Sequence, residues 1–188
     1  MTTIHLISHG NVIIDPKTDP GLWDLNDKGI RQSKKLATFD LWKEVSQIYV
    51  SGETKAQETA EIVRDSHVIP LEIDKQLNEF NKDSTGYLPF EEFMVHVDQF
   101  FAHPEKSEGG WETLNHTTER LLNFTADTAK KHPRKTIAFI GHGVALGMIV
   151  CKLKGIKKPS HDDIQKEIGS IATIDWDKQK VLSEWNVY

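Results

Sequence analysis

The sequence predicts an α/β fold: a three-layer α/β/α sandwich with a mainly parallel sheet. Short apolar runs typical of buried strands alternate with segments in which apolar residues recur at helical spacing. Strands that alternate with helices pair in parallel and are covered by helices on both faces. Near the C-terminal end, the apolar runs 171–176 and 181–187 flank the polar residues 177–180, which predicts a closing antiparallel hairpin.

The other elements of the sandwich can be assigned in order. Asn26 is placed to cap a helix, because its side chain can accept a hydrogen bond from a backbone N–H of the first turn. The run 137–140 is apolar throughout, which indicates a strand buried on both faces. In chain order we expect a strand at 3–8, a helix at about 27–38, strands at 48–51 and 69–73 with a helix between them, a helix at about 113–131, the strand at 137–140 and a helix at 144–154.

One helix in the middle of the chain is expected between Pro89 and Pro104. Its apolar residues recur at helical spacing and are expected to pack in the core: Phe90, Phe93, Met94, Val97 and Phe101. We interpret the 188 residues as a single domain in which about residues 80–110 form a helical insertion.

The composition limits the classes of function. Hydrophobic residues make up 38% of the chain and charged residues 27%, as in folded globular proteins. A formal net charge of −5 argues against general binding to nucleic acid or to acidic membranes, since both depend on basic surface. Cys151 is the only cysteine, so no disulfide can form within the chain, and the N-terminus reads as a strand rather than a cleavable leader. We therefore expect a cytoplasmic location.

Two histidines follow apolar strands, each directly before a glycine. His9 follows the first expected strand, and His142 follows the strand at 137–140. A third strand, 48–51, leads into a helix that opens with Lys55. Right-handed crossovers place the carboxyl ends of parallel strands at one edge of the sheet, where helix N-termini add amide donors for anions. The two imidazoles and the ammonium group are therefore expected to share one anion site.

A neutral imidazole in such a site can attack phosphorus and give a phosphohistidine, which water then cleaves. His9 is the candidate nucleophile, and His142 is the candidate donor to the phosphoryl oxygens. Nearby cations would stabilise charge on the transferring group and disfavour the imidazolium form of the nucleophile. The sequence has no His-x-x-x-His or Cys-x-x-Cys pair on one helix, so we expect no metal and no organic cofactor.

The segments 4–10, 48–61 and 137–143 together resemble the histidine phosphatase superfamily, the phosphoglycerate mutase-like enzymes. Residues 25–32 are similar to a helix start of that family, and residues 111–113 with Arg120 are similar to a Gly-Glu-Ser motif followed by an arginine. The resemblance implies a phosphoglycerate mutase-like fold and hydrolysis of a small phosphomonoester. Leu77-Asn78-Glu79 resembles the family's Leu-x-Glu, which implies that Glu79 is the proton donor.

The chain departs from the family's pattern within the phosphate pocket. Ser8 and Lys55 stand where the family has arginines, and Val12 stands where a hydroxyl residue is usual. Lysine keeps the charge of arginine but loses its two-pronged geometry, and serine keeps neither. Lys82 is the candidate substitute cation, and the chain resembles a branch with Ser-His-Gly in place of Arg-His-Gly. The expected phosphate-binding set is Lys55, Ser8, Gly10, Asn11, Lys82 and Gly143.

Three functions remain open from the sequence. The favoured one is a phosphatase, either weak or specialised, with His9, His142 and Glu79 as its catalytic residues. The alternative is a non-catalytic module that binds a phosphorylated ligand or free phosphate on the same scaffold. A third reading is a protein-interaction domain.

Overall fold

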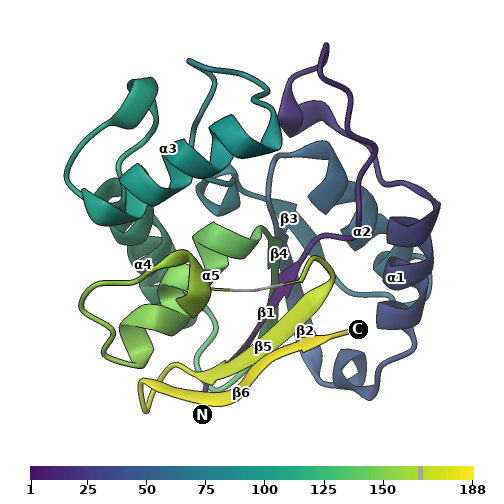
Figure 1. The fold of residues 1–188 in the computed structure, drawn as a ribbon. Coiled ribbons are helices and arrows are strands. Elements are labelled where there is room, and N and C mark those ends of the chain that lie inside the picture. Colours follow the sequence, from purple (N-terminus) through teal and green to yellow (C-terminus); the bar gives the residue numbers. More distant parts are fainter. Residues whose placement is uncertain (165–166) are drawn as a thin grey trace.

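The computed structural model describes residues 1–164 and 167–188. Its centre is a six-stranded sheet in the order β3-β2-β4-β1-β5-β6 (Figure 1). The neighbours β3, β2, β4 and β1 are parallel, whereas β5 pairs with β1 and β6 pairs with β5 in antiparallel fashion. The strands are β1 (Thr3–Ser8), β2 (Val45–Val50), β3 (Leu71–Ile73), β4 (Thr136–Gly141), β5 (Ser170–Asp175) and β6 (Lys180–Val187).

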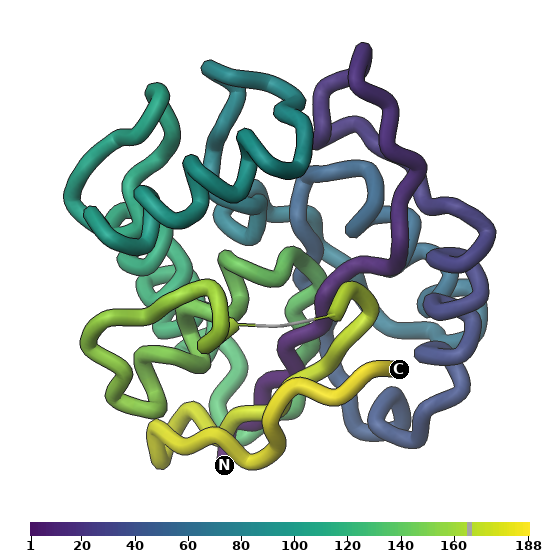
Figure 2. The backbone as a smooth tube through the Cα atoms, in the orientation of Figure 1, coloured from purple at the N-terminus to yellow at the C-terminus, as the bar shows by residue number. Residues whose placement is uncertain are grey.

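Helices cover both faces of the sheet. On one face α1 (Asp27–Ala37) packs against α2 (Thr54–Arg64), and on the other α4 (Leu114–Lys131) packs against α5 (Gly143–Leu153) (Figure 1). The remaining helix, α3 (Phe90–Ala102), lies beyond the carboxyl ends of the parallel strands, next to the loop that follows β1 (Figure 2). Single 3₁₀ turns occur at Pro20–Leu22, Asp40–Lys43, Lys75–Leu77, Glu108–Gly110 and His161–Asp163.

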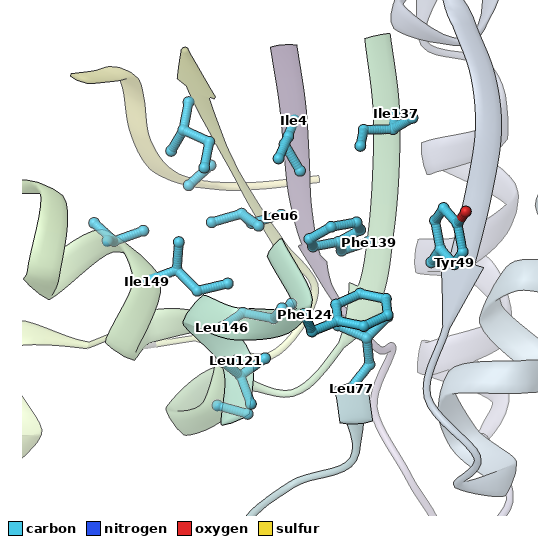
Figure 3. Packing of buried hydrophobic residues seen from close by; sticks show 14 residues of the cluster. Ile4, Leu6, Tyr49, Leu77, Leu121, Phe124, Ile137, Phe139, Leu146 and Ile149 are labelled. Carbon is cyan, nitrogen blue, oxygen red and sulfur yellow. The ribbon is translucent and has the colours of Figure 1, made fainter. Parts of the chain in front are cut away.

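Alternation along the strands builds two separate cores. In β4, Ile137 and Phe139 face α4 and α5, while Ala138 and Ile140 face α1 and α2. Figure 3 shows the first of these cores, where Phe139 packs beside residues from the neighbouring strands and helices. All four of these β4 side chains are fully buried. Each fully buried large aliphatic side chain contributes about 1.5–3 kcal/mol relative to exposure, so the central strand is firmly fixed.

The predicted three-layer α/β/α sandwich, with its mainly parallel sheet and closing hairpin, is confirmed. Asn26 caps α1 as expected, since its side chain accepts a hydrogen bond from the Gly29 N–H at 2.9 Å. Most boundaries differ from the expected ones by only one or two residues, the exception being β2. That strand begins at Val45, before the apolar run on which its prediction rested.

The apolar stripe of α3 was assigned incorrectly at two positions. Phe90 is 70% exposed, and Phe100, which the stripe omitted, is buried. The reason is that α3 does not lie on the sheet but packs on a small cluster that includes Phe80 and Trp111. Phe90, in the first turn of α3, is not part of that cluster. That residues 80–110 form an insertion stays a prediction.

Within residues 1–164 and 167–188, no helix combines the length and the hydropathy that crossing a lipid bilayer requires.

Candidate functional site

His9 and His142 meet at the carboxyl edge of the sheet. They follow β1 and β4, which are adjacent and parallel, with Ser8 in register with Gly141. The centroids of the two imidazole rings are 5.2 Å apart, and the rings meet edge to face. His9 is 9% exposed and His142 is 1% exposed. Two residues more than a hundred positions apart in the sequence therefore share one small, nearly dry site.

The hydrogen bond of His9 defines which ring nitrogen is free. Its Nδ1 lies 2.7 Å from the Gly10 carbonyl oxygen, which can only accept a hydrogen bond. Nδ1 must therefore carry the proton, and the lone pair lies on Nε2. Burial, assisted by the nearby Lys55 charge, lowers the pKa of His9 to about 4. At neutral pH the ring is neutral, and its Nε2 is available to attack an electrophile.

His142 is held as a hydrogen-bond donor. Its Nε2 lies 2.7 Å from the Ser51 Oγ, whose own proton goes to the Asn78 Oδ1 at 3.0 Å. The Asn78 Oδ1 also accepts from the Gly52 N–H, which identifies this atom as the amide oxygen. With its proton committed to Asn78, Ser51 accepts from His142, so the His142 Nε2 carries a hydrogen. Burial lowers the pKa of His142 well below its usual value, and the ring donates while neutral.

Glu53 joins Lys55 to His142. The Glu53 Oε2 lies 2.5 Å from the Lys55 Nζ, and the Glu53 Oε1 lies 3.3 Å from the His142 Nε2. The Lys55 Nζ also donates to the Pro20 carbonyl at 2.7 Å. Burial alone would raise the pKa of Glu53, but His142 and Lys55 outweigh it and hold that pKa well below the usual range. Glu53 is therefore ionised at neutral pH.

Glu79 caps the N-terminus of α5. Its two carboxyl oxygens accept from the Ala145 N–H at 2.9 Å and from the Val144 N–H at 3.3 Å. Its own backbone N–H donates to the Glu53 Oε1 at 2.8 Å, which ties the backbone of Glu79 to the Glu53 carboxylate. Burial raises the pKa of Glu79 despite these hydrogen bonds, so its protonated form persists to higher pH than that of an ordinary glutamate.

Arg120 anchors the segment that carries Glu79. Its guanidinium makes a two-pronged pair with Glu112, with both N–O distances at 3.0 Å. It also donates to the backbone carbonyls of Gln76 and Asn78, just before Glu79. Because a guanidinium presents its donors in a rigid plane, this clamp fixes the direction in which the segment runs. Arg120 and Glu112, which the sequence matched to one motif of the family, therefore form a structural clamp.

A cavity of about 810 Å³ opens outside the two histidines. Glu53 and Glu79 form part of its inner wall, while Lys82 and Trp111 come from the segment between β3 and α4. The Lys82 Nζ lies 5.0 Å from the centroid of the Phe80 ring, and the Lys82 charge adds to burial and Lys55 in lowering the pKa of His9. The candidate substitute cation thus lies beside the site, on the side from which a ligand would enter.

Two of the expected phosphate-binding side chains are bonded elsewhere. The Ser8 Oγ accepts from the backbone N–H groups of Gly169 and Ser170, at 3.1 and 2.9 Å, at the start of β5. The Asn11 Nδ2 donates to the Gln32 Oε1 at 2.8 Å, on α1. Both side chains hold the histidine loop against its neighbours. None of these hydrogen bonds directs the Ser8 or Asn11 side chain toward the ring of His9.

Gly10 and Gly29 allow the histidine loop to touch α1. A Cβ at Gly10 would lie 2.7 Å from the Gly29 carbonyl oxygen, and a Cβ at Gly29 would lie 2.0 Å from the Asn11 carbonyl oxygen. Both distances are too short for real contacts, and the obstacle in each case is backbone. The expected site residue Gly10 is therefore required for packing. Gly143, also expected in the site, is the first residue of α5 and offers only its backbone.

Sequence reasoning missed the role of three residues. Ser51, Glu53 and Asn78 all lie within segments that the resemblance covered, yet none was assigned to the site. The available signal was charge: Glu53 stands two residues before Lys55 at a helix start, where the lysine was expected to be free for an anion. In the part of the chain that the structure describes, no group of three His, Cys, Asp or Glu residues is arranged to hold a metal ion.

Comparison with known proteins identifies the scaffold. The model of the histidine phosphatase superfamily (branch 1) matches residues 4–187. The chain belongs to this family. Membership of the histidine phosphatase superfamily confirms the resemblance found in the sequence and accounts for the paired histidines. That the chain represents a separate branch with Ser-His-Gly in place of Arg-His-Gly stays a prediction.

Two curated proteins and one solved structure illustrate what this chain is similar to. It is 27% identical over 165 residues to the putative phosphoserine phosphatase 2 of Hydrogenobacter thermophilus, covering 84% of this chain and 79% of that protein. It is 26% identical over 162 residues to the uncharacterized phosphatase PhoE of Bacillus subtilis, covering 82% and 79%. The fold also matches a phosphoserine phosphatase from Entamoeba histolytica, solved with 3-phosphoglyceric acid, with a TM-score of 0.80 at 19% identity, covering 100% and 98%.

Proposed function

We propose that this chain hydrolyses a small phosphomonoester through a phosphohistidine formed on His9. The observation that carries the proposal is the state of the two rings. His9 is neutral with its Nε2 lone pair free, and the centroid of the His142 ring lies 5.2 Å from that of His9. The His142 Nε2 carries a hydrogen, which it must transfer from the Ser51 Oγ to a phosphoryl oxygen in order to act as the donor. A nucleophile beside a donor to the developing charge is the arrangement that phosphoryl transfer requires.

The reaction would proceed in two displacements. The His9 Nε2 attacks phosphorus, the ester P–O bond breaks, and the leaving oxygen takes the proton held by Glu79. Water then attacks the phosphohistidine, the P–N bond breaks, and the proton released by water returns to the Glu79 carboxylate. The raised pKa of Glu79 supports the first role, because a proton donor must still be protonated at working pH.

The comparisons support a small phosphorylated ligand. Relatives are named phosphoserine phosphatase, and one of them was solved with 3-phosphoglyceric acid. A cavity of about 810 Å³ suits a ligand of that size, and it carries both acidic and basic side chains. We retain a cytoplasmic location as part of the proposal.

A second candidate function is a module that binds a phosphorylated ligand without turnover. The observation that favours it is the shortage of free cations at the site. Lys55 is already paired with Glu53, and position 8 supplies a hydroxyl that is bonded to β5. If one missing donor costs about 3–4 kcal/mol of transition-state stabilisation, turnover could fall a hundredfold or more while binding persists.

A rapid-quench assay with an aryl phosphate separates the two functions. Phosphate that stays on the protein, is labile in acid and is stable in base identifies phosphohistidine and supports the enzyme. Absence of such phosphate across a broad panel of phosphomonoesters, together with protection of the fold by phosphate against heat, would instead establish the binding module.

The pH profile follows from the two ionisable partners. The nucleophile must be neutral, and the pKa of His9 is about 4, so kcat/KM is expected to rise with pH through that value. The proton donor must be protonated, so kcat/KM is expected to fall as pH rises through the raised pKa of Glu79. The expected profile is a bell whose optimum lies between the pKa of His9 and the raised pKa of Glu79, measured with an alkyl phosphate. A profile without the rise near pH 4 would contradict the assignment of His9, and a profile without a fall at higher pH would contradict that of Glu79.

Lys82 is expected to contribute directly to phosphate binding. Its ammonium borders the cavity beside Glu53 and Glu79, and its charge reaches His9. The Lys82→Ala variant is expected to bind inorganic phosphate about three- to tenfold more weakly, as loss of one partly exposed charge contact implies. Lys106→Ala is the matched control, because Lys106 is exposed after α3. Equal effects of the two substitutions, measured by calorimetric titration, would remove Lys82 from the site.

A further inference from the structure

The carboxylate of Glu53 lies where a bound anion would have to lie. Its two oxygens contact the Lys55 ammonium and the His142 Nε2, the two donors expected to hold a phosphoryl group. Lys55 is 7% exposed and His142 is 1% exposed, whereas Glu53 forms part of the cavity wall. An anion that enters from the cavity therefore meets the Glu53 carboxylate before it can reach either donor.

The charges at the site favour displacement of the Glu53 carboxylate by phosphate over the presence of both anions together. His9 and His142 are neutral, Lys55 and Glu53 cancel each other, and the charge of Lys82 lies near the carboxyl group of Glu79. A phosphate dianion between Lys55 and His142 would lie within a few ångströms of the Glu53 carboxylate. Like charges at that distance repel strongly in a poorly solvated site. Phosphate must therefore either move Glu53 aside or bind weakly.

We propose that Glu53 is a built-in competitor for the phosphoryl group: its carboxylate contacts Lys55 and His142, the two proposed donors to that group, and so sets a low affinity for phosphate. The inference rests on the proposed function, because it takes Lys55 and His142 as the phosphoryl donors. Its consequence is that free phosphate, the second product, leaves readily. An ester gains further contacts from its organic part in the cavity, so it can displace Glu53 where phosphate alone cannot.

The test is calorimetric titration of inorganic phosphate into three variants of the full chain. Glu53→Gln keeps the shape and an oxygen that can accept from the Glu79 N–H, but removes the charge. Glu53→Ala removes the charge and the accepting oxygen. Glu61→Gln is the matched control, since Glu61 is exposed on α2, the helix that Glu53 precedes. Both Glu53 variants are expected to bind phosphate at least about tenfold more tightly than the wild type, because one like charge has gone. Glu61→Gln is expected to bind as the wild type does.

Thermal unfolding gives a second readout. Without Glu53 the buried Lys55 has lost its carboxylate, so Glu53→Ala is expected to melt at a lower temperature than the wild type. Phosphate at millimolar concentration is expected to restore that loss while leaving the wild type almost unchanged. Adding His142→Ala to Glu53→Gln is expected to abolish the gain in affinity, which locates the phosphate at this site.

Equal or weaker phosphate binding in both Glu53 variants would overturn the inference, and Glu53 would then be a residue that orients Lys55. If the gain in phosphate affinity of Glu53→Gln persists after His142→Ala is added, the inference is also overturned, because phosphate would then bind elsewhere. Neither measurement needs turnover. Failure to trap a phosphohistidine would therefore count against the proposed function alone, and the titration would still decide the role of Glu53.

Discussion

The His9→Ala variant is expected to form no phosphohistidine and to lose at least about a thousandfold in kcat, since it lacks the only group proposed to bond to phosphorus. The free Nε2 of His9 and its pKa of about 4 leave the lone pair available throughout the neutral range. The measurement is a rapid quench with an aryl phosphate, followed by recovery of acid-labile phosphate on the protein.

The matched control for this experiment is His5→Ala. His5 lies on β1, the strand that His9 follows, and is also a poorly exposed imidazole with a pKa lowered to about 4, but its Nδ1 bonds the Thr173 Oγ1 on β5. Loss of His5 is expected to leave phosphohistidine formation intact. Phosphorylated protein recovered from His9→Ala, at the level of the wild type, would show that another group is the nucleophile.

Glu79→Gln is expected to slow hydrolysis of alkyl phosphates by about 10²- to 10⁴-fold, the usual contribution of a positioned proton donor. An alkoxide is a strong base and a poor leaving group, so it needs the proton that Glu79 holds. An aryl oxide leaves readily without one, and the same variant is expected to hydrolyse aryl phosphates within about tenfold of the wild type. The measurement is kcat/KM across esters of graded leaving-group basicity.

The pH profile of Glu79→Gln provides an independent check. Removing the carboxyl group is expected to remove the fall in kcat/KM at higher pH, while the rise through the pKa of His9 remains. The carbonyl oxygen of glutamine can still accept one hydrogen bond from the first turn of α5, so the fold is expected to survive. A uniform loss on alkyl and aryl esters would indicate that Glu79 supports the structure and does not donate a proton.

The fold was predictable because its signals are local. Asn26 can cap a helix wherever it precedes one, and the alternation of Ile137, Ala138, Phe139 and Ile140 between two cores requires a strand covered on both faces. Phe90 was assigned incorrectly because helical spacing shows which face of α3 is apolar. It does not show how far along that face the packing cluster extends. That extent is set by Phe80 and Trp111, which lie outside α3, on either side of it in the sequence.

The meeting of His9 and His142 followed from topology, since two parallel neighbours end at one edge of the sheet. The state of Lys55 did not follow. A lysine at a helix start predicts a free charge, and only coordinates reveal that Glu53 turns back to neutralise it. Likewise, a serine beside the nucleophile gave no sign that its hydroxyl is used by the backbone of Gly169 and Ser170.

The contact between Gly10 and Gly29 restricts how this pocket could be redesigned. The loop bearing the nucleophile contacts the first turn of α1 at Gly29 and leaves no room for one added carbon. The position of this loop therefore depends on the position of a helix about twenty residues further along the chain. A mutant library aimed at new substrates can vary Leu22 and Asp83, which border the cavity and have no part in the proposed chemistry. The same library should leave both glycines alone, because any side chain there would displace His9 itself.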